Sequence, residues 1–406
     1  MPRRCAGRLT ALPFPLLVWA AACGRGAPAA VARVDTLPGG SIQVTSPAPT
    51  GWRDSAGAVR LTETLRIQAP EGSPGELVEP GALAVDAQGR IYVADRKPAV
   101  IKVFDTTGAL VRSIGREGAG PGEFRVAFIA VRGANLVVHD PMQSRTSVFD
   151  TTGRFVRSWN SSCCYWAEIG IDSADRAYIP TMVVPDSGKR SRGWAYTRYL
   201  MDGRVLDTLY VPNQRADAKE WRFSSGNGRT ARAMMIMGVP FAPAMTHSLH
   251  PAGGFVRGWT GEYRIIRAPL GEDSTIVMTR NWTPEVIPDV MRRAQVEEAI
   301  TNAKATVGEA TARAVARLDD IPASAPAYMA LHVDLDGNIW APRLVGTDST
   351  HTLYDLFSPA GAWLGPVMAP VAVPQWGATY YGHGMIYTAI EDQEGRPTVV
   401  RLSVRR

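Results

Sequence analysis

Lysine is scarce in this sequence, with five residues among 44 basic side chains. The formal net charge is +6, and it falls to about +3 once the three arginines of an expected signal peptide are removed. The chain has no long basic run and no basic strip interleaved with aromatic residues of the kind that a nucleic-acid groove needs. We therefore expect no nucleic-acid partner, while 45% hydrophobic residues indicate a packed globular core.

Sequence motifs of common enzyme classes are also missing. There is no GxSxG elbow, no HExxH helix, no EF-hand loop and no CxxC pair. The glycine-rich loop 115–122 lacks the lysine of a phosphate-binding loop, and a strand of period two follows it instead of a helix. We interpret this loop as a crossing between neighbouring sheets, and we assign no catalytic residue.

Long apolar runs are absent after residue 23, so no later segment is expected to span a membrane. The first 22 residues join a basic start, MPRRCAGR, to a short apolar stretch broken by proline, LTALPFPLLVWAAA. This pattern is typical of a secretory signal peptide, which we predict over residues 1–22.

The residues Ala20-Ala21-Ala22-Cys23 resemble the bacterial lipobox, in which the cysteine is diacylated and anchors the mature protein. The resemblance implies lipidation of Cys23, and the alternative is cleavage by ordinary signal peptidase. Gly24 resembles the outer-membrane sorting pattern, which implies a lipoprotein on the periplasmic or cell-surface side that meets the membrane only through its anchor. Alanine, proline and glycine in residues 23–57 predict a flexible tether.

Internal repeats are the strongest signal in the chain. Windows starting at Ala82 and Phe128 both contain VFDTTG followed by an apolar strand. A period of ~40 to 50 residues made of four short alternating strands is typical of a propeller blade. Weaker copies start at Glu168, Ser248, Ala330 and Ala378. The last copy lacks an outer strand, which we expect residues 58–67 to supply, because an open ring would leave an unpaired sheet edge.

The segments GREGAGPGEF, ALAVDAQGRIYVAD and VFDTTG resemble NHL repeats. The chain is thus similar to bacterial six-bladed propeller lipoproteins of the NHL-repeat type. This implies an all-β fold, a six-bladed β-propeller of four-stranded antiparallel blades over residues 58–406. A helical insertion at about 283–327 interrupts it between blades four and five. We expect the inserted crossings to cover one mouth of the central channel, where propellers usually bind ligands.

Three residues at one repeat position, His250, His332 and Tyr380, are candidates for a site near the axis. Neutral imidazoles of His250 and His332 suit a divalent metal or proton transfer. The NHL-type enzyme that cleaves peptidyl-α-hydroxyglycines uses channel histidines on zinc, so the resemblance implies zinc as one option. Lactonase-like propellers bind calcium through channel carboxylates, for which Glu168 is the one acidic candidate. The alternative is that the histidines only pack between blades.

Two adjacent cysteines, Cys163 and Cys164, have only each other once Cys5 leaves with the signal peptide and Cys23 is lipidated. In an oxidising compartment they are candidates for a vicinal disulfide. With Tyr165 and Trp166 they would form a rigid apolar platform for a ligand, or merely seal the junction of blades two and three.

These patterns favour a binding module over an enzyme. The expected ligand is a protein, a peptide or a carbohydrate, and the expected state is a monomer. The alternative is a metal-dependent lyase or hydrolase that uses the channel histidines with zinc or calcium. Repeated aspartates are expected to bond local amides in turns, and these are Asp86, Asp105, Asp150, Asp334 and Asp336.

Overall fold

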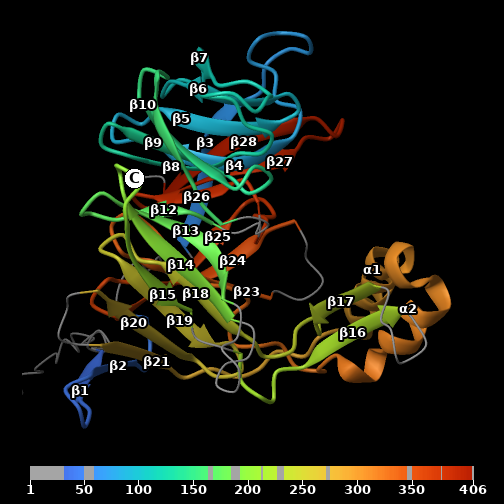
Figure 1. Cartoon of the computed structure of the whole chain (residues 1–406). Helices are drawn as coiled ribbons and strands as arrows, with labels where there is room; N and C mark the ends of the chain where they lie inside the picture. Colours follow the sequence, from blue (N-terminus) through green and yellow to red (C-terminus); the bar gives the residue numbers. More distant parts are fainter. Residues whose placement is uncertain are drawn as a thin grey trace, which may run out of the picture.

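The computed structural model describes residues 32–49, 59–162, 168–183, 193–211, 214–225, 233–270, 275–344, 350–375 and 377–404. In these residues short strands dominate, and most of them pair antiparallel in a series of sheets (Figure 1). The chain is an all-β protein with a propeller fold, which confirms the expected class.

The first three blades follow one another without interruption by other elements. Blade one contains β4 (Pro80–Val85), β5 (Ile91–Arg96), β6 (Ala99–Phe104) and β7 (Leu110–Ile114). Blade two contains β8 (Phe128–Arg132), β9 (Asn135–Asp140), β10 (Arg145–Asp150) and β11 (Phe155–Asn160). Blade three contains β12 (Gly170–Ile171), β13 (Arg176–Val183), β14 (Gly193–Leu200) and β15 (Val205–Tyr210). In each sheet the four strands pair in sequence order.

Of the remaining three blades, blade six includes a strand from the N-terminal part of the chain. Blade four contains β18 (Met245–Leu249), β19 (Gly254–Trp259), β20 (Arg264–Pro269) and β21 (Ile276–Arg280). Blade five contains β22 (His332–Val333), β23 (Ile339–Arg343), β24 (Thr352–Phe357) and β25 (Trp363–Ala369). Blade six contains β26 (Thr379–Gly382), β27 (Met385–Glu391), β28 (Pro397–Val404) and β3 (Val59–Ile67).

Strand β3 closes the ring as the repeat pattern predicts. It pairs antiparallel with β28, with Ile67 opposite Val399 and Leu61 opposite Val404. Its first residues also pair in parallel with the end of β25 in blade five. Figure 1 accordingly shows strands from the two ends of the chain in one sheet. The closure satisfies backbone groups that an open ring would leave unpaired.

Part of the segment expected as a flexible tether is folded into strands instead. β1 (Arg33–Thr36) and β2 (Ile42–Ser46) form a hairpin, and β2 pairs in parallel with β21 at the outer edge of blade four. Val44 is buried there, and the Ser46 hydroxyl accepts a hydrogen bond of 3.0 Å from the Trp363 backbone of blade five. The alternating apolar residues of IQVTS explain why the hairpin packs on the sheet.

The glycine-rich loop after β7 is a crossing between blades, as expected. Gly115 has a φ of 72°, and a Cβ there would lie 2.2 Å from the ring of Phe124. Only glycine permits both this backbone conformation and the close packing of that ring. Phe124 is buried in the cluster that joins blades one and two, so the loop has a packing role.

Two long crossings together form a satellite beside the propeller (Figure 1). One contributes β16 (Glu220–Ser225) and β17 (Ala233–Gly238), and the other contributes α1 (Asp289–Val307), α2 (Glu309–Val315) and a short 3-10 helix, η1 (Leu318–Asp320). Trp221 and Phe223 of β16 pack against Ile300 and Ala303 of α1 in a separate core. The satellite therefore has its own small hydrophobic core.

The apolar face of α1 agrees in part with the sequence pattern, which predicts a stripe of Val290, Ala294, Ile300 and Val307. Ile300 and Val307 are buried, whereas Val290 and Ala294 are exposed. Ala299 and Ala303 complete the buried face, at three- and four-residue spacing.

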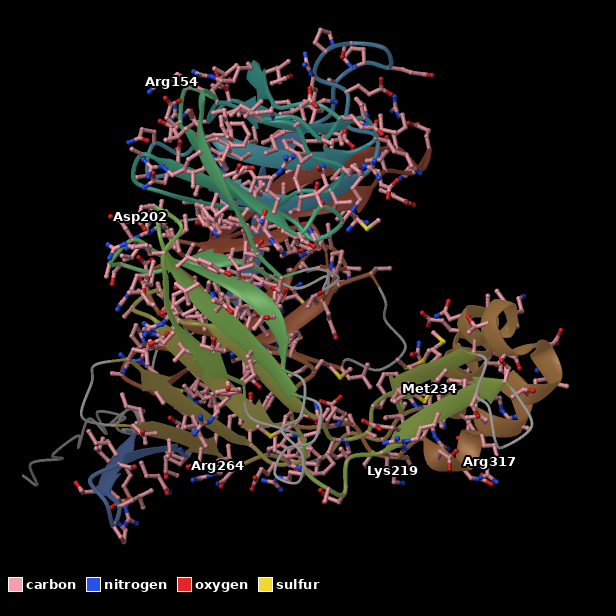
Figure 2. All side chains as sticks on the ribbon, viewed as in Figure 1. Arg154, Asp202, Lys219, Met234, Arg264 and Arg317 are labelled. Atoms are coloured by element: carbon pink, nitrogen blue, oxygen red, sulfur yellow. The ribbon has the colours of Figure 1, made fainter. Side chains whose placement is uncertain are left out.

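The satellite also has an exposed apolar side chain, Met234 of β17 (Figure 2). No helix among the described residues is long and apolar enough to cross a membrane.

Candidate functional site

A cavity of about 500 Å³ occupies the centre of the ring. Residues of the inner strands of all six blades line it, among them Ala84, Ala130, Gly170, Ser248, His332 and Tyr380. These six occupy one repeat position, because each pairs with the second strand of its blade just before the inner hairpin turn. The volume of the cavity lies within the range of small-molecule pockets in proteins.

The register in blade four differs from the predicted one by two residues. Ser248 stands where we expected His250, because Ser248 pairs with Val256 just as His332 pairs with Trp340. His250 instead begins the hairpin turn, with its backbone N–H donating to Gly254. The proposed alignment of His250, His332 and Tyr380 at one position is therefore wrong for His250.

His250 replaces the aspartate that begins this turn in other blades. The Asp86 carboxylate accepts from the backbone N–H groups of Gln88 and Arg90, and Asp334 does the same in blade five. In blade four the Nδ1 atom of His250 accepts from the Ala252 N–H at 3.1 Å. Burial lowers the pKa of His250 to about 4, and nearby Arg267 adds to the shift, so the ring stays neutral. His250 is thus a turn residue at the wall of the cavity.

The predicted role of the repeated aspartates is confirmed for four of them. Asp86, Asp105, Asp150 and Asp334 accept local backbone N–H groups. Asp336 differs, because its carboxylate accepts from Nδ1 of His383 in the next blade at 3.0 Å. That contact joins the turns of blades five and six.

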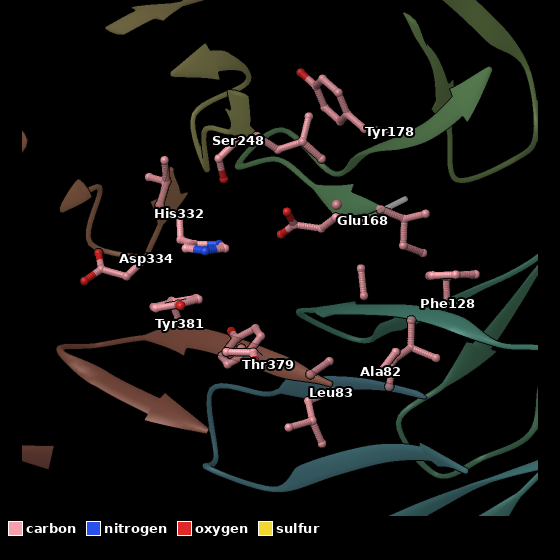
Figure 3. A pocket seen from close by; sticks show the side chains of 18 of the residues that line it. Ala82, Leu83, Phe128, Glu168, Tyr178, Ser248, His332, Asp334, Thr379 and Tyr381 are labelled. Atoms are coloured by element: carbon pink, nitrogen blue, oxygen red, sulfur yellow. The ribbon is translucent and has the colours of Figure 1, made fainter. Parts of the chain in front are cut away.

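Glu168 is the distinctive charged residue of the cavity. It lies two residues before β12, the inner strand of blade three, and is exposed to the cavity. Figure 3 shows its carboxylate pointing away from Phe128, toward His332. The surrounding protein limits its hydration and raises its pKa to about 7. No hydrogen bond or ion pair joins it to any other residue that the structure describes.

Close to Glu168, His332 and Tyr381 form a stacked pair. Their ring centroids lie 4.4 Å apart with an interplanar angle of 13°. Burial lowers the pKa of His332 to about 4, so its imidazole is neutral, and its Nε2 atom is buried without a hydrogen-bond partner among the described residues. The Tyr381 hydroxyl contacts that of Tyr354 at 3.2 Å, which fixes the tyrosine between blades five and six.

Tyr380 lines the cavity but also has a structural contact. Its hydroxyl donates to the Val85 carbonyl at 3.2 Å and so links blade six to blade one. This contact leaves the ring at the cavity wall, in the predicted place. Tyr381, which we did not predict, is the aromatic residue that meets His332.

The close packing at Gly170 explains how this part of the wall forms. A Cβ at Gly170 would lie 2.9 Å from Cδ1 of Leu249 in blade four. The absence of a side chain lets the inner strands of blades three and four approach each other. The sequence signal that could have pointed to the site is this glycine at an inner repeat position, two residues after a carboxylate.

Several predicted residues lie outside the described part of the chain. These are Cys23, Cys163, Cys164, Tyr165 and Trp166, so neither the lipid anchor nor the vicinal disulfide is assigned a geometry. The described residues of the satellite do not line the cavity. In Figure 1 the satellite stands beside the propeller.

The geometry gives limited support for a metal. Among the described residues, no group of three or more His, Cys, Asp or Glu side chains is placed to hold one. Nδ1 of His250 already accepts a backbone N–H, so this atom is not available to a metal ion. Glu168 and His332 remain as polar groups at the cavity without hydrogen-bond partners among the described residues.

Comparison with known proteins agrees with the fold. A family model described as a 6-bladed beta-propeller matches residues 77–165. An exported protein of Bacteroides fragilis has 11% identity and a TM-score of 0.48, with 90% of this chain and 100% of that chain covered. No curated protein sequence matches the chain.

Two further solved structures are similar at the same low level. A member of the DUF4221 family from Bacteroides vulgatus has 11% identity and a TM-score of 0.46, covering 86% of this chain and 99% of its own. Virginiamycin B lyase from Staphylococcus aureus with quinupristin has 10% identity and a TM-score of 0.38, covering 85% and 88%. These values are too low to transfer a site or an activity.

Proposed function

We propose that this protein is a binding module whose ligand occupies the central cavity of the propeller. The observation that carries the proposal is the cavity of about 500 Å³, to which all six blades contribute. Pockets that bind small molecules are mostly apolar and contain a few well-placed polar groups. Ala82, Phe128 and Leu249 supply apolar surface here, and Glu168 and Ser248 supply polar groups.

The cellular setting that we propose comes from the sequence. An NHL-type propeller with a signal peptide over residues 1–22 and a lipidated Cys23 would face the periplasm or the cell surface from the outer membrane. There it would act as a monomer on a short tether, and its ligand would be part of a protein, a peptide or a carbohydrate that enters the cavity. A Cys23→Ser variant should then leave the membrane fraction, and continued membrane association would contradict the anchor.

The cavity proposal is tested by blocking the cavity from its wall. A ligand found in a thermal-shift screen of the folded protein should raise the midpoint of unfolding, since binding to the native state alone stabilises it by about 2.7 kcal/mol at 100 times Kd. Ala130→Trp places a bulky ring in the cavity and should abolish the shift. Val111→Trp on the exposed side of β7 is the matched control and should preserve it. Equal shifts in both variants would place the ligand elsewhere.

The alternative is a metal-dependent lyase or hydrolase. Glu168 and the neutral imidazole of His332 are the observation in its favour, because a carboxylate and an imidazole are both ligands of zinc. Catalytic zinc sites usually have three protein ligands, and the described residues supply two at most here. Stoichiometric metal in the purified protein that is lost in His332→Ala would favour this function over the binding module.

A further inference from the structure

The carboxylates that line the cavity differ in what neutralises them. Asp172 accepts from Nε of Arg176 at 2.8 Å and from the Tyr178 hydroxyl at 2.9 Å. Asp334 accepts from the side chains of Asn338 and Trp340, at 3.0 Å in each case. Glu168 has no comparable donor among the described residues. Two of the three carboxylates therefore belong to blade turns, and the third is available to a ligand.

The basic side chains of the cavity wall do not neutralise the charge of Glu168. Arg96 forms an ion pair with Glu79, with 3.6 Å between Nη1 and Oε1. His250 and His332 are neutral near pH 7, because burial lowers the pKa of each to about 4. His247 is neutral for the same reason. A cation supplied from outside would therefore be the natural partner of an ionised Glu168.

The groups around the Glu168 carboxylate suit an organic cation better than a hydrated metal ion. The carboxylate points toward the stacked pair of His332 and Tyr381, and Phe128 lines the cavity on the opposite side of Glu168 (Figure 3). Aromatic faces attract ammonium groups and pack against hydrocarbon, whereas they offer no oxygen ligand to calcium. The volume also leaves room for an apolar body beyond the charged group.

From these observations we infer that the cavity binds a primary or secondary amine with an apolar or aromatic body, its ammonium group against the carboxylate of Glu168. This inference rests on the proposed function, since it names the class of ligand that the cavity takes. The ammonium forms a charge-assisted hydrogen bond with Glu168, and the body packs against apolar residues of the inner strands of blades one and two. No covalent step is involved.

The experiment uses two probes that differ only in charge. 4-Phenylbutylammonium and 4-phenylbutan-1-ol are titrated into the full-length protein at pH 7.5, and binding is followed by calorimetry. We expect the ammonium to bind at least tenfold more tightly than the alcohol. Glu168→Gln should remove this preference, whereas Asp336→Asn, which removes a carboxylate that does not line the cavity, should keep it.

Proton release gives a second readout that a loss of folding would not produce. At pH 6 Glu168 is mostly protonated, since its pKa is about 7, and binding of a cation displaces that proton. The measured enthalpy should then depend on the ionisation enthalpy of the buffer for the ammonium, and it should not for the alcohol or for Glu168→Gln. Affinity for the ammonium should fall about tenfold per pH unit below pH 7.

The outcomes separate this inference from the function on which it rests. Equal binding of the two probes, or an ammonium affinity unchanged in Glu168→Gln, would overturn the amine class while leaving a cavity that binds ligands. Failure of both probes would also overturn the amine class. The binding function itself fails only if Ala130→Trp leaves every ligand of the screen unaffected.

Discussion

The junction between blades four and five and the central cavity both hold charge inside the molecule, but their charges have different surroundings. At the junction, Oδ2 of the buried Asp355 is 2.8 Å from Arg280 and accepts from the Tyr263 hydroxyl at 2.6 Å. The Arg280 guanidinium lies between the rings of Tyr263 and Trp363, at 4.3 and 4.2 Å from their centroids. In the cavity, Glu168 has no such partner among the described residues.

This difference separates residues that hold the blades together from residues that are available for binding. A paired charge in the interior costs desolvation but fixes the geometry of its neighbours, and removal of one partner is strongly destabilising. An unpaired carboxylate with a raised pKa in a cleft lowers the stability of the fold when it is ionised, so it is a candidate for function. The comparison predicts opposite effects of substitution in the two regions.

The largest effect is expected at the junction. Asp355→Ala leaves Arg280 buried without its partner and should lower the free energy of unfolding by about 3–5 kcal/mol. The measurement is the midpoint of guanidinium-induced unfolding. A double variant, Asp355→Leu with Arg280→Met, should recover much of the loss because no charge stays unpaired. A single-variant loss below about 1 kcal/mol would show that the pair does not hold the blades together.

A smaller effect is expected at the turn of blade one. Asp86 accepts from the Gln88 and Arg90 N–H groups at 3.0 and 2.9 Å and from the Tyr92 hydroxyl at 3.1 Å. Asp86→Ala should lower the unfolding free energy by about 2–3 kcal/mol, since buried donors lose their acceptor. Asp105→Ala, in an exposed turn of the same blade, is the control and should have a clearly smaller effect. Equal losses of unfolding free energy in the two variants would contradict a larger contribution from the buried turn.

Ionised Glu168 should lower the stability of the fold, in contrast to Asp355 and Asp86, and a pH series can show this. Its pKa is about 7 in the folded protein, against an ordinary value of 4.5, so the folded state retains a proton that the unfolded state loses. Stability from this group is present below pH 4.5 and is lost as the pH rises to 7. Relative to Glu168→Gln, the free energy of unfolding of the wild type should fall by about 1 kcal/mol between pH 5 and pH 8. Water in the cavity screens the carboxylate and keeps the change this small. A difference that does not change with pH would contradict this.

The smallest effect is expected for an exchange in blade four. His250→Asp introduces the turn residue of blades one, three and five, and its carboxylate can accept from the Ala252 N–H, so stability should change by less than about 1 kcal/mol. His250→Ala leaves that N–H without an acceptor and should cost about 1–2 kcal/mol. Thermal unfolding of the two variants measures the contrast. A greater loss in His250→Asp than in His250→Ala would mean that the imidazole has a role beyond the turn.

Prediction from the sequence succeeded where the repeat is regular. The VFDTTG copies, the alternating apolar strands and the missing last strand predicted the blades and the closure by β3, because each blade must bury both faces and pair its edges. It failed for β1 and β2, because the outer edge of blade four that they cover is created only on folding. It failed for His250 because blade four uses histidine where the repeat has aspartate, which shifted the alignment by two residues.

The site was predictable only in part. Repetition placed His332 and Tyr380 at the channel wall, and Glu168 was noticed as the single acid at its position but was weighed only as a calcium ligand. Tyr381 was not among the predicted residues, and strand alternation places it on the opposite face from Tyr380. In a propeller that opposite face meets the preceding blade, which is why Tyr381 stacks on His332.

The amino-acid sequence by itself determined that this chain is an all-β propeller, because alternation and turn residues act locally and recur in every blade. The tertiary structure alone decided which polar residues are left without partners. Whether a carboxylate is neutralised depends on donors from distant strands, as Asp355 is by Arg280 and Tyr263 across a blade junction. Glu168 meets no such donor among the described residues, and that depends on how the six inner strands close around the cavity rather than on its neighbours in sequence.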